Sequence, residues 1–226
     1  MYKISIIIPT YNEANNLPLL FSDLSIINKE VEILIIDCGS KDKTIDIANI
    51  YGAKIHKSKE KNRGLQLNIG AKNALGEWFI FLHADSRLNP DWLKRIKSVL
   101  QDDESYVYSF MFQIDSKKII YRFLEILVNF RSIFLKTPYG DQGLIIHRKT
   151  YFKNNGYSKI PLMEDLDFLR RLNKQNLKLL NIPIYTSARK WEKTNIVLQS
   201  IKNWNYRRRW IRGDSLKSIY KDYYKN

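Results

Sequence analysis

Acidic residues recur where a short apolar run gives way to a turn or a helical pattern. Asp37 and Asp85 each follow a β-branched or aromatic run, while Glu164 and Asp165 stand side by side at the head of a helical pattern. A carboxylate beyond a strand can hold a hard divalent cation together with phosphate oxygens. Adjacent carboxylates can raise one pKa toward neutrality, which suits a general base. These positions predict metal-assisted chemistry on a phosphorylated substrate.

Each position also has a purely structural interpretation. Asp37, in Asp-x-Gly-Ser, is typical of a turn followed by a serine helix cap. Asp85 fits a tight turn, and the acids Glu164 and Asp165 fit a first helical turn whose dipole favours negative charge. His83 is more typical of a packed residue at a strand end than of a ligand. Spacing alone leaves these alternatives open.

Basic and aromatic residues gather near the end of the sequence, at residues 189–191 (RKW) and 206–210 (YRRRW). The mixture suits a diphosphate clamp, an interfacial lipid anchor, nucleic-acid stacking or an ordinary amphipathic surface. The 38 Lys and Arg residues against 23 Asp and Glu give a net charge of +15, of which residues 189–226 carry +8 from eleven basic and three acidic side chains. The partners are therefore expected to be anionic.

Alternating apolar runs and helical patterns predict an α/β fold in which right-handed crossovers join parallel strands. The predicted strands are residues 3–9, 31–36, 53–56, 77–82, 106–114, 143–147 and 177–185. The predicted helices are residues 15–27, 42–51, 64–75, 89–100, 117–136 and 163–175, with one or two basic helices from residue 194. The division is thus a domain over residues 1–193 and a basic helical segment over residues 194–226. Ligands bind at the carboxyl edge of such sheets.

Length and composition limit the remaining classes. A chain of 226 residues can bury a full α/β core without covalent staples. The single cysteine, Cys38, excludes an internal disulfide framework and favours a reducing compartment. With no visible leader and no apolar run long enough to cross a bilayer, we predict a cytoplasmic protein that can lie on the inner face of the membrane.

Taken together and in order, several short motifs resemble family 2 glycosyltransferases of the GT-A type, over residues 4 to about 213. The matching segments are residues 7–13 (IIPTYNE), 36–42 (IDCGSKD), 68–71 (NIGA) ahead of Gly76, 81–86 (FLHADS) and 163–165 (MED). A small bacterial subfamily is more similar still, at residues 139–143 (YGDQG), 160–165 (IPLMED) and 186–192 (TSARKWE). The resemblance implies a Rossmann-like GT-A fold with a mostly parallel central sheet flanked by helices.

The resemblance also implies roles for individual residues. Asp165 matches the catalytic base of inverting members, and Asp85 the last position of the motif that holds Mg²⁺ or Mn²⁺. Asp37 falls on the carboxylate that recognises the base, usually uracil. The implied substrate and nucleotide positions are Pro9, Tyr11, Glu13, Asp37, Arg63, Ala84, Glu164, Arg189 and Trp191. Two departures affect the donor: His83 stands where the motif usually has an acid, and Cys38 where a second aspartate is common.

The predicted function is metal-dependent, inverting transfer of a sugar from a nucleotide donor, with UDP favoured, to a hydroxyl acceptor. The amphipathic stretch at residues 119–135 and the basic tail suit an anionic membrane surface, and with it a lipid-linked acceptor. The alternative is a nucleic-acid-binding or nucleotide-binding protein that uses the basic tail without sugar transfer. Carboxylates at successive strand ends argue against nucleic acid because they repel its phosphates.

Overall fold

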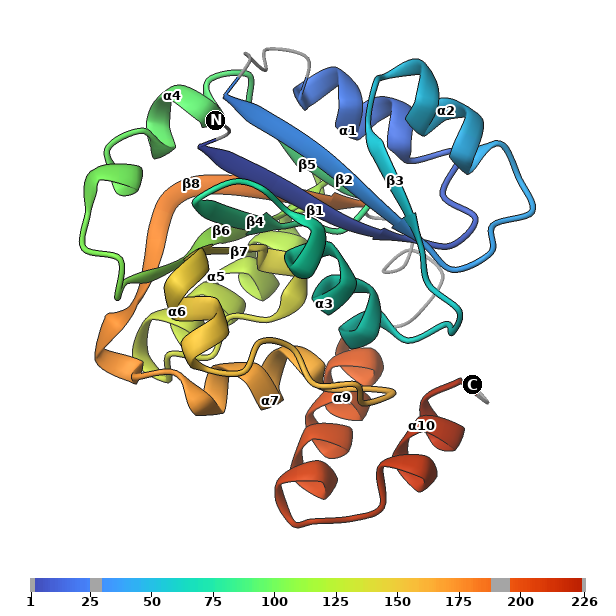
Figure 1. The fold of residues 1–226 in the computed structure, drawn as a ribbon. Helices are drawn as coiled ribbons and strands as arrows, with labels where there is room; N and C mark the ends of the chain where they lie inside the picture. Colours follow the sequence, from blue (N-terminus) through green and yellow to red (C-terminus); the bar gives the residue numbers. More distant parts are fainter. Residues whose placement is uncertain (1–2, 25–29, 188–195, 225–226) are drawn as a thin grey trace.

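The computed structural model describes residues 3–24, 30–187 and 196–224, which form a curled eight-stranded sheet with helices on both faces (Figure 1). The strands are β1 (Ile4–Thr10), β2 (Val31–Asp37), β3 (Lys54–Lys57), β4 (Trp78–Phe81), β5 (Ser86–Leu88), β6 (Val107–Asp115), β7 (Leu144–His147) and β8 (Leu177–Ser187). The helices are α1 (Leu17–Leu24), α2 (Thr44–Ile50), α3 (Arg63–Asn73), α4 (Trp92–Ile96), α5 (Ile119–Phe134), α6 (Arg148–Lys153), α7 (Glu164–Arg171), α9 (Ile196–Ile211) and α10 (Leu216–Tyr224). The predicted α/β class is confirmed.

The first half of the sheet is parallel, in the order β3-β2-β1-β4, so the carboxyl ends of these strands share one edge. β1 lies inside and separates two apolar layers. Ile6 and Ile8 pack in the core that contains α1, α2 and α4, while Ile7 packs in the core that contains α3, α6 and α7. The β-branched run of β1 meets both layers because successive side chains alternate between the two faces of a strand.

The second half of the sheet is mixed, which the predicted mostly parallel sheet allows. β7 runs antiparallel to both β4 and β6, and β5 runs antiparallel to β8, while β6 and β8 are parallel. Two elements were not predicted: β5 has only three residues, and α6 has only six. Neither is long enough to display a period in its sequence.

Two predicted helices have different bounds in the structure, and the one expected over residues 89–100 ends at Ile96. The helix expected from Asn89 starts at Trp92, and the Asn89 side chain does not cap it; the backbone carbonyl of Asn89 accepts the Trp92 N–H instead. The helix expected over residues 163–175 ends at Arg171 and is followed by the short turn η3 (Lys174–Asn176). The polar residues after Arg171 form that separate turn with Asn173 as its cap.

The two C-terminal helices pack against each other and lie beyond the sheet layers (Figure 1). The Tyr206 hydroxyl of α9 donates to the Asp222 carbonyl of α10 at 3.1 Å, and the rings of Tyr206 and Tyr223 meet edge to face at 5.6 Å between centroids. The division at residue 194 falls outside the described residues and stays a prediction. Within the ranges described above, none of the helices has the length and apolarity needed to cross a membrane.

A buried glutamate ties the parallel strands together. Glu32 of β2 is 4% exposed and accepts from the Ser5 hydroxyl at 2.6 Å, the Lys54 ammonium at 2.6 Å and the Leu75 N–H at 2.5 Å. Burial alone raises the pKa of Glu32, but the bonds from Lys54, Ser5 and Leu75 outweigh it and hold the pKa below its ordinary value. The ionised form therefore stabilises the fold.

Replacing Glu32 by glutamine is expected to lower the free energy of unfolding at pH 7 by about 1–3 kcal/mol, since a charge-assisted network loses its anion. Because the pKa is lower in the folded state, the wild-type advantage is present above the unfolded pKa and disappears as the pH falls through the folded value. Urea unfolding of both proteins at pH 7 and pH 3 measures this. The exposed Glu77→Gln is the control, and an equal loss at both pH values would contradict the assignment.

Candidate active site

Asp37 lies at the carboxyl end of β2, where the sequence predicts a nucleotide contact. Its side chain is 3% exposed and accepts from the N–H groups of Gly39 at 2.8 Å and Ser40 at 2.9 Å, and from the hydroxyls of Ser40 and Thr10. Gly39 has φ +90°, which a residue with a side chain rarely adopts. The carboxylate therefore builds the turn after β2, and its contact with a base stays a prediction.

Pro9, Tyr11 and Glu13 lie along the end of β1 and the loop after it. The Lys61 ammonium sits 3.8 Å from the centre of the Tyr11 ring, so a cation covers this aromatic face. Burial raises the pKa of Glu13, and the charges of Asp85 and Asp42 raise it further, against a lowering hydrogen bond from Asn16. Asp85 thus acts electrostatically on Glu13, although the two residues follow different strands.

A cavity of about 280 Å³ opens beside this edge, close to the lower end of the range of roughly 300–1,000 Å³ for small-molecule sites. It is lined by Arg63, His83, Asp85, Tyr139, Gly140, Asp141, Pro161, Leu162, Met163, Glu164, Asp165, Leu166, Thr186, Ser187, Asn203, Tyr206, Arg207 and Tyr223. Four predicted site residues, from three separate parts of the chain, line it: Arg63, Asp85, Glu164 and Asp165. Asp37 and the loop after β1 are not among the lining residues, and Ala84 is buried in the apolar core.

Arg63, at the start of α3, is the centre of the polar network on the cavity wall. Its Nε donates to Glu164 Oε1, its Nη1 donates to His83 Nε2 at 2.9 Å, and its Nη2 lies 3.8 Å from Asp165 Oδ2. Burial by itself lowers the pKa of the Arg63 guanidinium, but the charges of Glu164 and Asp165 raise it above its ordinary value. The group is therefore a permanent cation in the wall.

Glu164 is the buried partner of that cation. Its side chain is 4% exposed, and burial raises the pKa of Glu164, aided by the charge of Asp165 and opposed by Arg63. The Cβ that Gly64 lacks would lie 3.1 Å from the Glu164 Cβ and 2.2 Å from the Ser158 carbonyl oxygen. Only glycine allows α3 to approach this closely, so the Arg63–Glu164 pair depends on Gly64.

The contact with Arg63 decides the state of His83. Arginine has no acceptor atom, so Nε2 of His83 must accept, and the imidazole proton then sits on Nδ1. Nδ1 in turn lies 4.0 Å from Asp85 Oδ1. His83 therefore accepts from Arg63 through Nε2 and turns Nδ1 toward Asp85, and whether it packs or ligates stays a prediction.

Asp165, in the first turn of α7, presents one edge of its carboxylate to the cavity. Oδ2 accepts from the Gly140 N–H at 2.8 Å, and Oδ1 accepts from the Leu166 N–H at 2.8 Å. The Asp165 side chain is 17% exposed. A Cβ on Gly140 would lie 2.7 Å from Arg63 Nη2 and 3.1 Å from His83 Nε2, so a larger residue here would displace those side chains.

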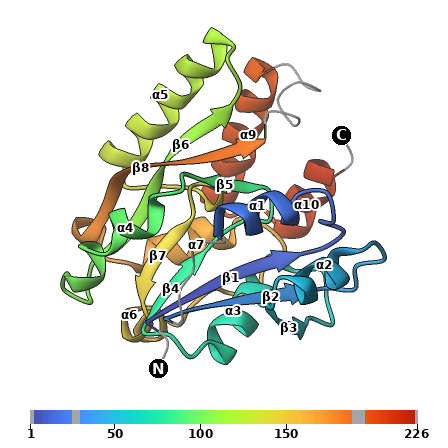
Figure 2. The same ribbon diagram turned by 90° about the horizontal axis from the view of Figure 1, so that it is seen from above.

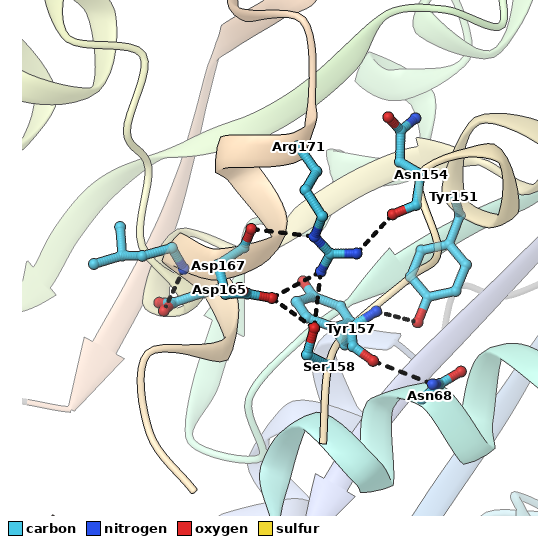
Figure 3. Close-up of polar contacts among 9 residues, drawn as sticks. Asn68, Tyr151, Asn154, Tyr157, Ser158, Asp165, Asp167 and Arg171 are labelled. Atoms are coloured by element: carbon cyan, nitrogen blue, oxygen red, sulfur yellow. Dashed lines mark hydrogen bonds and ion pairs between the residues drawn. The ribbon is translucent and has the colours of Figure 1, made fainter. Parts of the chain in front are cut away.

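A second network fixes the helix that carries Asp165 (Figure 3). Asp167 accepts from the Ser158 hydroxyl at 2.6 Å and from Arg171 at 2.9 Å, and Arg171 also donates to the Asn154 carbonyl at 2.7 Å. In the same view, Asn68 of α3 donates to the Tyr157 carbonyl at 3.1 Å. These bonds attach α7 to the preceding loop, and the loop in turn to α3, so the helix that carries Asp165 is held in place.

The sequence analysis assigned no role to several residues that line the cavity. Tyr139 precedes η2 (Gly140–Gln142), and its ring packs under the Arg131 guanidinium of α5 at 3.5 Å and accepts a hydrogen bond at its hydroxyl from Arg207 Nη1 at 3.1 Å. Asn203, Tyr206 and Tyr223 reach the cavity from the C-terminal helices. The YGDQG motif and the basic aromatic cluster at residues 206–210 were the available signals.

Two predicted residues, Arg189 and Trp191, lie outside the described residues, so their place relative to the cavity stays a prediction. Among the residues that the structure does describe, no three His, Cys, Asp or Glu side chains form a metal-binding cluster. Asp85 offers a single carboxylate, 44% exposed, on the cavity wall. One carboxylate with water and diphosphate oxygens is a chemically sufficient set for Mg²⁺ or Mn²⁺, so the residues present fit such an ion.

Comparison with known proteins gives a consistent result. The profile of glycosyl transferase family 2 matches residues 5–213. The 4,4'-diaponeurosporenoate glycosyltransferase of Staphylococcus haemolyticus is 26% identical over 181 residues, covering 77% of this chain and 47% of that protein. The chain spans less than half the length of the curated relatives it matches.

Two solved structures share the fold. An S. aureus TarS fragment in complex with UDP-GlcNAc superimposes with a TM-score of 0.66 at 21% identity, covering 82% of this chain and 58% of that one. Glucosyl-3-phosphoglycerate synthase from Mycobacterium tuberculosis, in complex with Mn²⁺, UDP and glucosyl-3-phosphoglycerate, gives a TM-score of 0.58 at 16% identity, covering 80% of this chain and 70% of that one. At these identities, the likeness establishes the predicted GT-A architecture.

Proposed function

The chain belongs to glycosyl transferase family 2, and on that premise we propose that it transfers a sugar from a UDP-linked donor to a hydroxyl acceptor, with inversion at the anomeric carbon. One observation carries the proposal: Asp85 and Asp165, from unconnected segments of the chain, line the same cavity. The Asp85 carboxylate is suited to binding a cation, and the Asp165 carboxylate to accepting a proton. Sugar transfer from a nucleotide needs both functions, because a diphosphate leaves while a hydroxyl is deprotonated.

In the proposed reaction, Asp165 accepts the proton of the acceptor hydroxyl as that oxygen bonds to the anomeric carbon. The bond between the anomeric carbon and the diphosphate oxygen breaks in the same displacement, and the electron pair leaves with the nucleoside diphosphate. The Gly140 N–H and Arg63 orient Asp165. A divalent ion held by Asp85 supplies, when bound, positive charge that stabilises the departing diphosphate.

The proposed donor site uses the predicted residues at the ends of β1 and β2 together with those that line the cavity. The structural neighbours hold UDP or UDP-GlcNAc, which supports a uridine nucleotide here. We assign the base and ribose to the end of β1 and β2, with Pro9, Tyr11, Glu13 and Asp37. We assign the diphosphate to Asp85 and to the arginines that line the cavity, Arg63 and Arg207. Arg189 and Trp191 are proposed to contact it as well.

The acceptor is proposed to be a lipid-linked hydroxyl compound, and the protein to act at the inner face of the membrane. Support comes from the position of Tyr139, which lines the cavity and packs directly on Arg131 of α5. α5 carries exposed apolar side chains along its length. An acceptor held at a lipid surface therefore has a short path to the cavity.

A panel of nucleotide sugars incubated with the protein and Mn²⁺ tests the function. Slow hydrolysis of one UDP-sugar is expected even without the acceptor, because water can take its place. If no nucleotide sugar is consumed and UDP with Mn²⁺ leaves thermal unfolding unchanged, while oligonucleotides bind with steep salt dependence, the nucleic-acid alternative is favoured.

Replacing Asp85 by alanine is expected to weaken UDP binding in the presence of Mn²⁺ by at least about tenfold, since the proposed ion loses its protein ligand. UDP binding without the metal should change little. Titration calorimetry with and without Mn²⁺ measures both. Asp91→Ala, at an exposed aspartate outside the cavity lining, is the matched control, and equal metal-dependent affinity in all three proteins would remove Asp85 from the site.

A further inference from the structure

α5 buries several polar side chains and exposes most of its large apolar ones, while Tyr121, Leu124 and Val128 pack inward against β6. Eight large apolar residues on this one helix are between 44% and 75% exposed: Ile119, Ile120, Phe123, Ile126, Leu127, Phe130, Ile133 and Phe134. The buried positions include Glu125, Asn129 and Ser132. A helix on a water-soluble domain ordinarily has the opposite arrangement.

The reason lies in the strand beneath the helix. β7 pairs with β6 only at Val107 and Tyr108, so within the described ranges the backbone of β6 beyond them has no strand on that side. Asn129 fills the gap by accepting from the Phe112 N–H at 2.8 Å and donating to the Phe112 carbonyl at 3.0 Å, and Glu125 accepts from the Ile114 N–H at 2.7 Å. Buried backbone groups need such partners.

These bonds fix the rotation of the helix. α5 cannot turn its apolar residues toward the sheet without leaving the Phe112 and Ile114 backbone groups unpaired. Ser132, on the same face of α5, donates to Gln142 Oε1 at 2.7 Å. Gln142 in turn donates to the Phe110 carbonyl of β6 at 3.2 Å. The outward apolar face, with eight large apolar side chains exposed on one helix, is therefore a built feature of the fold.

Charge identifies the partner of this face. Residues 117–136 contain five basic side chains and one acid, Glu125, which is buried. Lys117 and Lys118 precede the helix and Lys136 follows it, so basic residues flank both ends of an uncharged apolar face. An apolar face between cations fits the interface of a bilayer with anionic headgroups. A second copy in an antiparallel pair would bring the lysines of opposite ends together, which disfavours self-association.

We infer that the outer face of α5 docks on an anionic lipid bilayer, lying in the plane of the interface with its apolar side chains among the acyl chains. Figure 2 shows α5 along one side of the molecule, with α2 on the opposite side. Docking through α5 leaves the ends of β1 and β2 facing the aqueous phase. The surface does not depend on the proposed transfer reaction, because binding to lipid requires no turnover.

Flotation with vesicles tests the inference on the full chain at physiological salt. The protein is expected to float with vesicles of phosphatidylcholine and phosphatidylglycerol, and much less with phosphatidylcholine alone. Ile126→Asp/Phe130→Asp should lower the partition coefficient by roughly tenfold or more. The control is Ile50→Asp/Leu75→Asp, which alters side chains of 79% and 54% exposure on other elements and should float like the wild type.

Thermal unfolding and UDP binding of the α5 variant in solution should match the wild type, which separates lost docking from lost folding and from failure of the proposed function. A wild-type protein that stays at the bottom of the gradient with both vesicle types overturns the inference. So does an α5 variant that floats unchanged. A dimer in light scattering that the α5 substitutions dissociate, with no flotation, assigns the face to a second copy instead.

Discussion

Asparagine in place of Asp165 is expected to lower sugar transfer by roughly 10²- to 10⁴-fold, the usual contribution of a general base. Asparagine keeps the shape of the side chain, and its one oxygen can still accept from the Gly140 N–H, although the bond from the Leu166 N–H is lost. What it loses is the ability to take a proton from the acceptor hydroxyl. UDP binding in the presence of Mn²⁺ should remain within a few-fold of the wild type.

The same helix supplies a matched control. Asp167 carries an identical carboxylate, but its contacts are Ser158 and Arg171, and it does not line the cavity. Asp167→Asn should lower stability somewhat and leave turnover of the folded enzyme within a few-fold. Steady-state rates with saturating donor and acceptor compare the two variants. Near-normal turnover of Asp165→Asn would show that another group takes the proton.

The second large effect is expected at Arg63. Arg63→Met keeps the aliphatic stem but leaves Glu164 as a buried carboxylate without its cation, which should cost about 3 kcal/mol of folding free energy. This is the low end for buried pairs because the Arg63 side chain is 37% exposed. Transfer should fall as well, because the hydrogen bond to His83 and the charge next to Asp165 are lost together.

The pH dependence of that loss has a definite sign. Burial already raises the pKa of Glu164, and removal of Arg63 raises it further. Above the unfolded pKa of about 4.3, the folded variant holds a proton that the unfolded chain has released, so its stability falls as the pH rises through the raised value. Urea unfolding should therefore show a larger deficit at pH 8 than at pH 5.

A double substitution separates the pair from other effects. Arg63→Met/Glu164→Gln removes the buried charge along with its partner and should recover most of the lost stability, whereas transfer should stay low. If the single and double variants were equally unstable, Arg63 would stabilise the fold through contacts other than Glu164. The coupling energy from the four proteins gives the strength of the interaction directly.

Most of the fold could be predicted from the sequence because, in the first half of the chain, local sequence patterns agree with the burial that the tertiary structure requires. The β-branched residues of β1 must be buried on both sides, and that requirement alone specifies an interior strand. The patterns failed where elements are short or where pairing is decided by distant segments. β5, with Ser86 and Arg87, has too few residues to show alternation, and nothing local to β7 says that it runs antiparallel to β4.

The candidate site was likewise predictable only where a local pattern marks its residues. Asp85 and Asp165 were candidates because one follows a strand and the other begins a helix, and the family resemblance supplied their roles; both line one cavity. The pairing of Arg63 with Glu164 joins residues 101 positions apart, and no local pattern encodes it. The sequence also did not show that Arg207 lines the cavity. Its basic and aromatic cluster at residues 206–210 is compatible with several kinds of surface, and only the packing of α9 decides among them. The inward polar face of α5 likewise depends on where β7 stops pairing with β6.

A crystal of the protein with Mn²⁺ and UDP, with the anomalous signal of manganese recorded, tests the central claim most directly. The account predicts one strong anomalous peak beside the Asp85 carboxylate, with the diphosphate in the cavity between Asp85 and Asp165. Uridine should lie toward the end of β1 and the turn at Asp37. A nucleotide bound on another surface, or a manganese site away from Asp85 with the cavity unaltered, would contradict it.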